Sequence, residues 1–134
     1  MNRKLIYGLF ALCTLIYSCD KDKDVPAGDV NIHVSVKHHM LAIPFSEVYI
    51  KYNTLEFPGK ETSLYDAMLV TDAEGYVKIA NMGNGDKKYV LYAKGIDPNW
   101  DTTHTTPVWG FQPVAVNTKP GEDKEKYVTI PVSE

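Results

Sequence analysis

The chain has 134 residues and a formal net charge of −3 at pH 7, from 14 lysines and arginines against 17 acidic residues. That length suits one domain with a modest hydrophobic core. Arginine occurs once, at Arg3, and a mildly acidic chain of this kind lacks the basic patch that attracts nucleic acid, so we expect no nucleic-acid partner.

The first 18 residues have the pattern of a signal peptide. Residues 2–4 include two basic side chains, and residues 5–17 are almost wholly apolar but too few to cross a bilayer core of about 30 Å. The run Ile16-Tyr17-Ser18-Cys19 resembles the lipobox of bacterial lipoproteins. The resemblance implies that the Cys19 thiol receives a diacylglycerol and that cleavage makes this residue the N-terminus. The alternatives are an ordinary secretory signal that contains a cysteine and an uncleaved signal anchor.

This reading divides the chain into a signal peptide at 1–18, a lipid-anchored tether at 19–28 and a domain at 29–134. Residues 20–24 alternate aspartate and lysine. Acidic residues directly after the lipid-bearing cysteine resemble the export signal of Bacteroidetes-type surface lipoproteins. The resemblance implies an outer-membrane lipoprotein on the cell surface, with a periplasm-facing location as the alternative. The membrane is then a partner through the lipid on Cys19, and buried acyl chains hold the domain there.

The domain begins with a strongly alternating stretch. Over residues 29–37, Val30, Ile32, Val34 and Val36 alternate with polar residues, which is typical of a half-buried strand. Similar patterns predict further strands at 45–52, 66–71, 76–80, 88–95, 108–116 and 125–132. Turn signals separate these strands and no stretch has a helical period. We therefore predict an all-β fold, a seven-stranded antiparallel two-sheet sandwich, in which Pro113 lies at a sheet edge or bulge.

Three of these stretches carry a family resemblance. Residues 45–50, 69–79 and 88–93 resemble the prealbumin-like sandwich, whose relatives include transthyretin-like, carboxypeptidase regulatory-like and Cna-B-type domains. The resemblance covers roughly residues 29–96 and implies a fold more than a function. The last predicted strand holds no asparagine that could form the Cna-B-type isopeptide bond with Lys37. The C-terminus also lacks the Tyr-Arg-Gly-Ser motif of the transthyretin-related hydrolases.

Metal and catalytic sites are not predicted. His38 and His39 are adjacent, so in a strand they point to opposite faces unless the turn bends between them, and a metal needs three or four converging ligands. We therefore predict no metal, no cofactor and no enzymatic activity. The open alternative is a small metal-dependent hydrolase that brings His104 together with Asp97 and Asp101.

Aromatic residues beside polar side chains are the best indication of a binding site. They gather in the long loop at 96–107 and in the strand after it. The candidate ligand-binding residues are Asp97, Asn99, Trp100, Asp101, His104 and Trp109. We therefore predict a membrane-anchored, non-catalytic lipoprotein domain with a binding or accessory role in the cell envelope, for a glycan or protein ligand. A structural spacer or pilus-like subunit is the alternative, and Trp109 could instead cover the core.

Overall fold

A computed structural model describes residues 30–83, 85–98, 106–119 and 124–134. Cys19, with the predicted signal peptide and tether, lies outside the described residues, as do four candidates for the binding site, Asn99, Trp100, Asp101 and His104. The strands and the one 3₁₀ helix of the described part are β1 (Val30–His38), β2 (Leu41–Ala42), β3 (Glu47–Tyr52), η1 (Thr62–Leu64), β4 (Ala67–Val70), β5 (Tyr76–Ile79), β6 (Lys87–Asp97), β7 (Thr106–Val116) and β8 (Lys124–Pro131).

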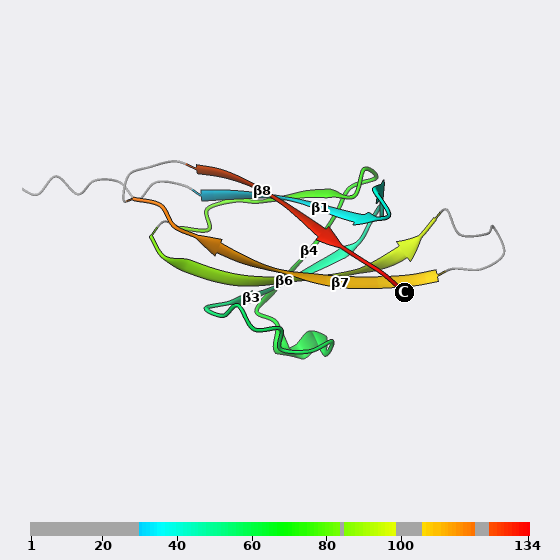
Figure 1. Ribbon diagram of the computed structural model, residues 1–134, viewed down its shortest axis with the longest axis horizontal. Coiled ribbons are helices and arrows are strands. Elements are labelled where there is room, and N and C mark those ends of the chain that lie inside the picture. The colour runs from blue at the N-terminus through cyan, green and yellow to red at the C-terminus, as the bar shows by residue number, and fades with distance from the viewer. Residues whose placement is uncertain (1–29, 84, 99–105, 120–123) are drawn as a thin grey trace, which may run out of the picture.

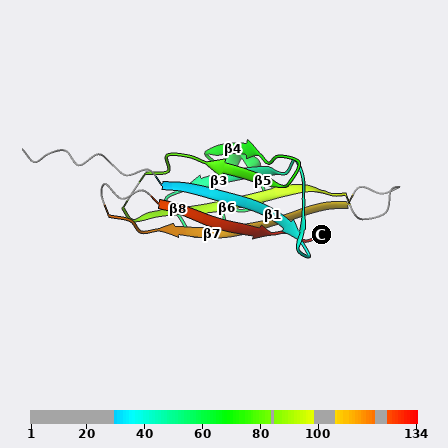
Figure 2. The same ribbon diagram turned by 90° about the horizontal axis from the view of Figure 1, so that it is seen from above.

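These strands form two packed sheets (Figures 1 and 2). In sheet A, β1 pairs with β2 and β5 along one edge and with β8 along the other, while sheet B has the order β4-β3-β6-β7. The predicted all-β two-sheet sandwich is confirmed. Pro113 lies in β7, the end strand of sheet B. No described strand pairs with the open side of β7, so a proline can be accommodated there without the loss of a hydrogen bond on that side. Among the described residues, no helix is long and apolar enough to span a membrane.

The strand count and one pairing differ from the prediction. The described residues include eight strands, because the two-residue β2 returns along β1 after a tight turn at His39 and Met40, whose φ angles are 47° and 75°. β8 runs parallel to β1, with Val30 opposite Lys124 and Lys37 opposite Pro131, whereas the other pairs are antiparallel. Side-chain alternation is the same in both arrangements, so the sequence pattern could not distinguish them.

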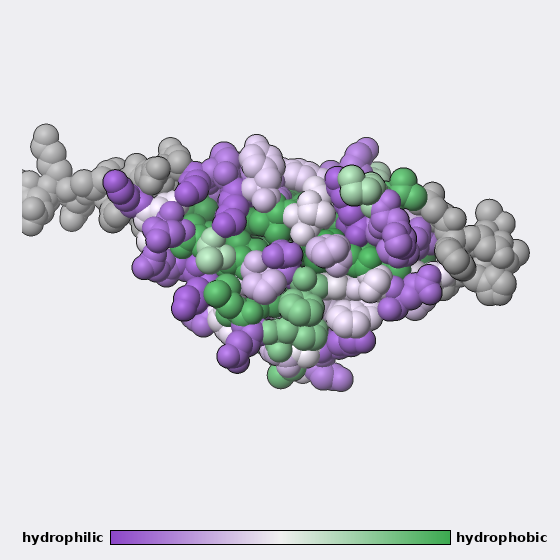
Figure 3. Space-filling model, viewed as in Figure 1, coloured by the Kyte–Doolittle hydropathy of each residue, from purple (hydrophilic) through white to green (hydrophobic). Residues whose placement is uncertain are grey.

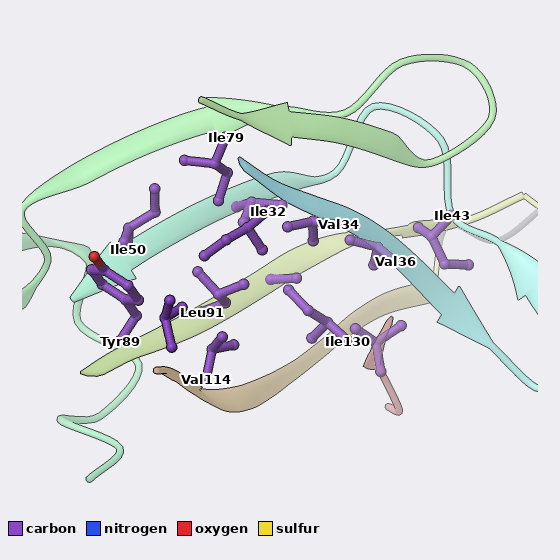
Figure 4. Close-up of a cluster of buried hydrophobic side chains, with 14 of the residues drawn as sticks. Ile32, Val34, Val36, Ile43, Ile50, Ile79, Tyr89, Leu91, Val114 and Ile130 are labelled. Carbon is purple, nitrogen blue, oxygen red and sulfur yellow. The ribbon is translucent and has the colours of Figure 1, made fainter. Parts of the chain in front are cut away.

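The core lies between the two sheets (Figure 4). The four alternating apolar residues of β1 are fully buried and meet Ile50, Leu91 and Val114 of sheet B. Each such side chain contributes about 1.5–3 kcal/mol when it is fully removed from water. The sequence alternation of the first strand therefore corresponds directly to the inner face of sheet A.

The C-terminal residues connect the two sheets at one end. After β8, Ser133 exchanges two backbone hydrogen bonds of 2.9 Å with Trp109 of β7. Val132 also donates to the Lys37 carbonyl at 2.9 Å. This crossing brings Pro131 so close to β7 that a Cβ built on Gly110 would lie 1.9 Å from the Pro131 carbonyl oxygen. Glycine is required at this position because no side chain fits.

Candidate functional site

The outer face of sheet B carries a row of aromatic side chains across three strands. The register places Tyr49 of β3 beside Tyr92 of β6, and Tyr92 beside Phe111 of β7. All three lie on the face turned away from the core, yet Tyr49 is only 8% exposed and Tyr92 only 3%. A sheet face open to water would leave such side chains accessible, so another segment of the chain must cover them.

The covering segment is the loop at 53–66, which contains η1 and folds beneath β3 in Figure 1. Phe57 stacks on Phe111 with ring centroids 4.3 Å apart, and Tyr65 stacks on Tyr92 at 5.4 Å. The Tyr65 hydroxyl donates to the Gly59 carbonyl at 2.8 Å. Burial raises the pKa of Tyr65 to about 12. The loop and the outer face of the sheet thus form a second, aromatic cluster outside the main core.

One carboxylate fastens this loop to the sheet. Asp66, at the end of the loop, accepts a hydrogen bond from the Tyr52 backbone N–H at 2.8 Å and from Lys51 Nζ at 3.0 Å. These two hydrogen bonds, the backbone one first, hold the pKa of the Asp66 carboxyl below its ordinary value. The loop therefore returns to β4 at a defined place, and its aromatic rings are positioned over the sheet.

A charged pair lies next to the aromatic row. Lys94 Nζ is 3.0 Å from Glu47 Oε2, and the same oxygen accepts from the Tyr49 hydroxyl at 2.7 Å. These hydrogen bonds, from Tyr49 and then from Lys94, lower the pKa of Glu47, and the bond to Glu47 raises the pKa of Lys94. The Lys94 ammonium also lies 5.3 Å from the Tyr49 ring centroid. Glu47 and Lys94 are therefore both charged at neutral pH and held in a fixed arrangement.

A groove of about 670 Å³ lies beside this charged pair, and its lining extends to Pro98, directly after β6, and to Pro107, near the start of β7. We call it the sheet-B groove. Its lining includes Phe45, Glu47, Tyr92, Lys94, Ile96 and Trp109. Most of this lining is apolar, with the Glu47–Lys94 pair as a polar element, which is the usual composition of a pocket for a small ligand or an anchoring side chain. Phe45 is 67% exposed at its rim.

Trp109 is the predicted binding residue that the structure places in this groove. Its half-buried ring is contacted by the Lys60 ammonium, 3.5 Å from the ring centroid, and it stacks beside Phe57 at 6.3 Å. Trp109 therefore belongs to the outer face of sheet B. It does not belong to the main core between the sheets, which was the alternative position.

Asp97, a second predicted binding residue, does not line this groove. It is buried at the end of β6, and its Oδ2 lies 2.7 Å from His38 Nδ1. The turn after His38 does bend, since His39 has a positive φ, and the two histidine rings are 4.2 Å apart. Within the described ranges, no group of three histidine, cysteine or acidic residues could hold a metal ion.

Some of the groove residues could be predicted from the sequence, and others could not. In the predicted strand at 88–95, Tyr92 alternates with Leu91 and Ala93, which predicts that it lies on the other face of the sheet. Glu47 has the same signal in the predicted strand at 45–52, and Ile96 begins the predicted binding loop at 96–107. Nothing in the sequence marks Phe45 as a rim residue. Phe45 lies in the connection before β3 with a φ of 53°, a conformation that a bulky side chain rarely adopts, and this turns its ring to the rim.

Comparisons with known proteins add little to this description. No family model matches the chain, and neither does any curated protein. Among solved structures, the chain is similar to the crystal structure of a candidate carbohydrate-binding protein from Pseudomonas aeruginosa. The identity is 12%, the TM-score is 0.46, and the similarity covers 81% of this chain and 90% of that one. Such a likeness concerns the course of the backbone and assigns no ligand to this chain.

Proposed function

We propose that the chain is a membrane-anchored, non-catalytic lipoprotein domain that binds a glycan or protein ligand of the cell envelope in the sheet-B groove. The groove carries the proposal. An apolar channel with Trp109 in its lining can receive the flat face of a sugar or an apolar side chain, and the Glu47–Lys94 pair can orient the polar groups of either.

The second aromatic cluster supports a binding role because it makes the groove rigid. The loop at 53–66 packs against Tyr92 through Tyr65 and against Trp109 through Phe57. A ligand that contacts such rings does not need to order them first, and the entropic cost of binding is smaller. Phe45 and Ile96, by contrast, are exposed apolar side chains at the rim, and a bound ligand would remove their surface from water.

The position of the groove is compatible with the proposed lipid anchor. β1 begins at Val30 at one end of the sandwich, and β6 ends at Asp97 at the other end (Figure 1). The rim residue Ile96 directly precedes Asp97. A tether of residues 20–28, attached through Cys19, would reach at most about 30 Å when extended. The groove would then open away from the lipid surface, toward ligands outside.

The test compares the unaltered full chain with three variants on a glycan array and on an array of envelope-protein peptides. Replacing Phe45 by alanine removes rim surface, and replacing Trp109 by alanine removes the ring from the lining. The control is Met68→Ala, which removes an exposed apolar side chain from the same sheet face outside the groove. We expect both groove variants to weaken the strongest array signal about tenfold or more, as for loss of an aromatic anchor, while the control binds normally.

Equal signals from all three variants would contradict the groove as the binding site. An array on which the unaltered chain binds no glycan and no peptide would contradict the proposed ligand classes. Phe45→Ala is the more decisive of the two groove variants, because the exposed Phe45 ring contributes little to the stability of the fold.

A further inference from the structure

The open edges of the two sheets form a second cavity on a different side of the molecule. β7 ends sheet B and β8 ends sheet A, and Figures 1 and 3 look onto these two strands. The strands are joined at one end by the Trp109–Ser133 backbone bonds and toward the other by Lys126 Nζ, which donates to the Ala115 carbonyl at 2.5 Å. A cavity of about 360 Å³ lies along these edges, which we call the edge cleft. Its lining includes Gln112, Pro113, Ala115, Lys126, Tyr127 and Thr129.

Tyr127 is the most distinctive residue of the edge cleft. It is an aromatic side chain with 76% of its surface exposed. One face of its ring stacks on His33, with centroids 4.5 Å apart and planes at 14°. Among the described residues, no other ring stacks on it, so its second face is available to a ligand.

The exposed ring rests on a fixed support. Both ring nitrogens of His33 take part in hydrogen bonds, Nδ1 with the Tyr76 hydroxyl at 2.5 Å and Nε2 with the Glu125 carboxylate. Glu125 in turn accepts from Asn31 Nδ2 at 2.7 Å. Three strands of sheet A contribute to this network, which fixes the orientation of the His33 ring that stacks on Tyr127. An exposed tyrosine with such a support keeps one orientation and loses little freedom when a ligand stacks on it.

The other walls of the edge cleft are polar. Gln112 Nε2 donates to the Pro113 carbonyl at 3.1 Å, which holds the side-chain amide in place. Thr129 adds a hydroxyl, and Lys126 adds an ammonium whose position is set by its bond to Ala115. An aromatic face with hydroxyl, amide and amine groups around it has the chemistry that recognises a sugar ring, whose C–H face is apolar and whose edge carries hydroxyls.

We infer that the edge cleft is a subsite for a neutral hexopyranose, which stacks on the free face of Tyr127 and hydrogen-bonds through its hydroxyls to Gln112 and Thr129. A neutral sugar is favoured because Gln112 and Thr129 are uncharged and the Lys126 ammonium is already bonded to the Ala115 carbonyl. This site shares no residue with the sheet-B groove and does not depend on the function proposed for it.

A strand added from another chain is the competing occupant of two open sheet edges. The edges are poorly suited to it. Lys126 crosses to the carbonyl of Ala115, and Pro113 supplies no N–H to a new ladder. Charged side chains and proline on edge strands are the usual devices that prevent such pairing. A small ligand between the edges needs no ladder and meets neither obstacle.

Saturation-transfer NMR tests the inference with the full chain in a phosphocholine detergent and three probes, the methyl glycosides of glucose, galactose and mannose. We expect saturation transfer to the ring C–H protons of at least one probe, with a millimolar Kd. Tyr127→Ala should weaken that affinity about tenfold, and Tyr127→Phe, which keeps the ring, should stay within about threefold. Phe45→Ala, in the sheet-B groove, should leave it unchanged.

Three results would overturn the inference. The first is no transfer to any of the three probes, and the second is equal binding by the chain and Tyr127→Ala. The third is a loss that follows Phe45→Ala instead, which would move the sugar to the sheet-B groove. Dimerisation of the unaltered chain in light scattering that Tyr127→Ala abolishes would favour an added strand and would also reject the sugar subsite.

Discussion

Replacing Gly110 by alanine should destabilise the domain strongly, although the change adds one methyl group. The new Cβ would lie 1.9 Å from the Pro131 carbonyl oxygen and 3.0 Å from the Val132 Cα, both of them backbone atoms that cannot rotate away. The C-terminal segment must therefore move off β7. That movement breaks the two 2.9 Å bonds between Trp109 and Ser133 and strains the bond from Val132 to Lys37.

The magnitude follows from these contacts. Two lost backbone hydrogen bonds cost about 1 kcal/mol each, and overpacking adds about 1–3 kcal/mol. The sum is about 4 kcal/mol, a large part of the 5–15 kcal/mol typical of a domain, and it corresponds to a fall in Tm of roughly 20 °C. Urea unfolding followed by circular dichroism measures the free energy, and a thermal scan measures Tm.

Gly85→Ala is the matched control for Gly110→Ala. Gly85 has a φ of 81° but open space around it, so alanine there meets only backbone strain, of about 1–2 kcal/mol. A loss at Gly110 no larger than that at Gly85 would refute the close crossing of the C-terminal segment over β7.

Two further predictions concern the outer face of sheet B. Phe57→Ala removes the ring that stacks on Phe111 and should cost about 2 kcal/mol in urea unfolding. With Trp100 replaced by phenylalanine, the fluorescence of Trp109 should shift to the red as its ring becomes more exposed to water, and unchanged emission would contradict the cluster. Glu47 has a pKa lowered from 4.5, first by the hydrogen bond from Tyr49, so its stabilisation is present above about pH 4.5 and is lost as the pH falls through the folded-state pKa. The loss of stability between pH 5 and 3 should therefore be smaller in Glu47→Gln, and equal pH profiles for the two chains would reject this assignment.

Strands were more predictable than the groove. The alternation of β1 needs only a sheet with one buried face, and the structure buries each of its four alternating apolar residues completely. Tyr92 shows the limit of this reasoning. Its alternation placed it on an outer face, where exposure is expected, but it is 3% exposed because the loop at 53–66 covers it. The loop is identified in the sequence by turn residues, and these carry no information on where it packs.

By itself, the sequence determined the secondary structure and which side chains of β1 face the core, because alternation and turn residues act over a few neighbouring positions. Tertiary structure decided which strands and loops pack against each other. It set β8 parallel to β1, folded a loop over the aromatic row and placed Phe45 at the rim of the groove. These outcomes depend on contacts between segments far apart in the chain, and a local pattern is compatible with several such contacts.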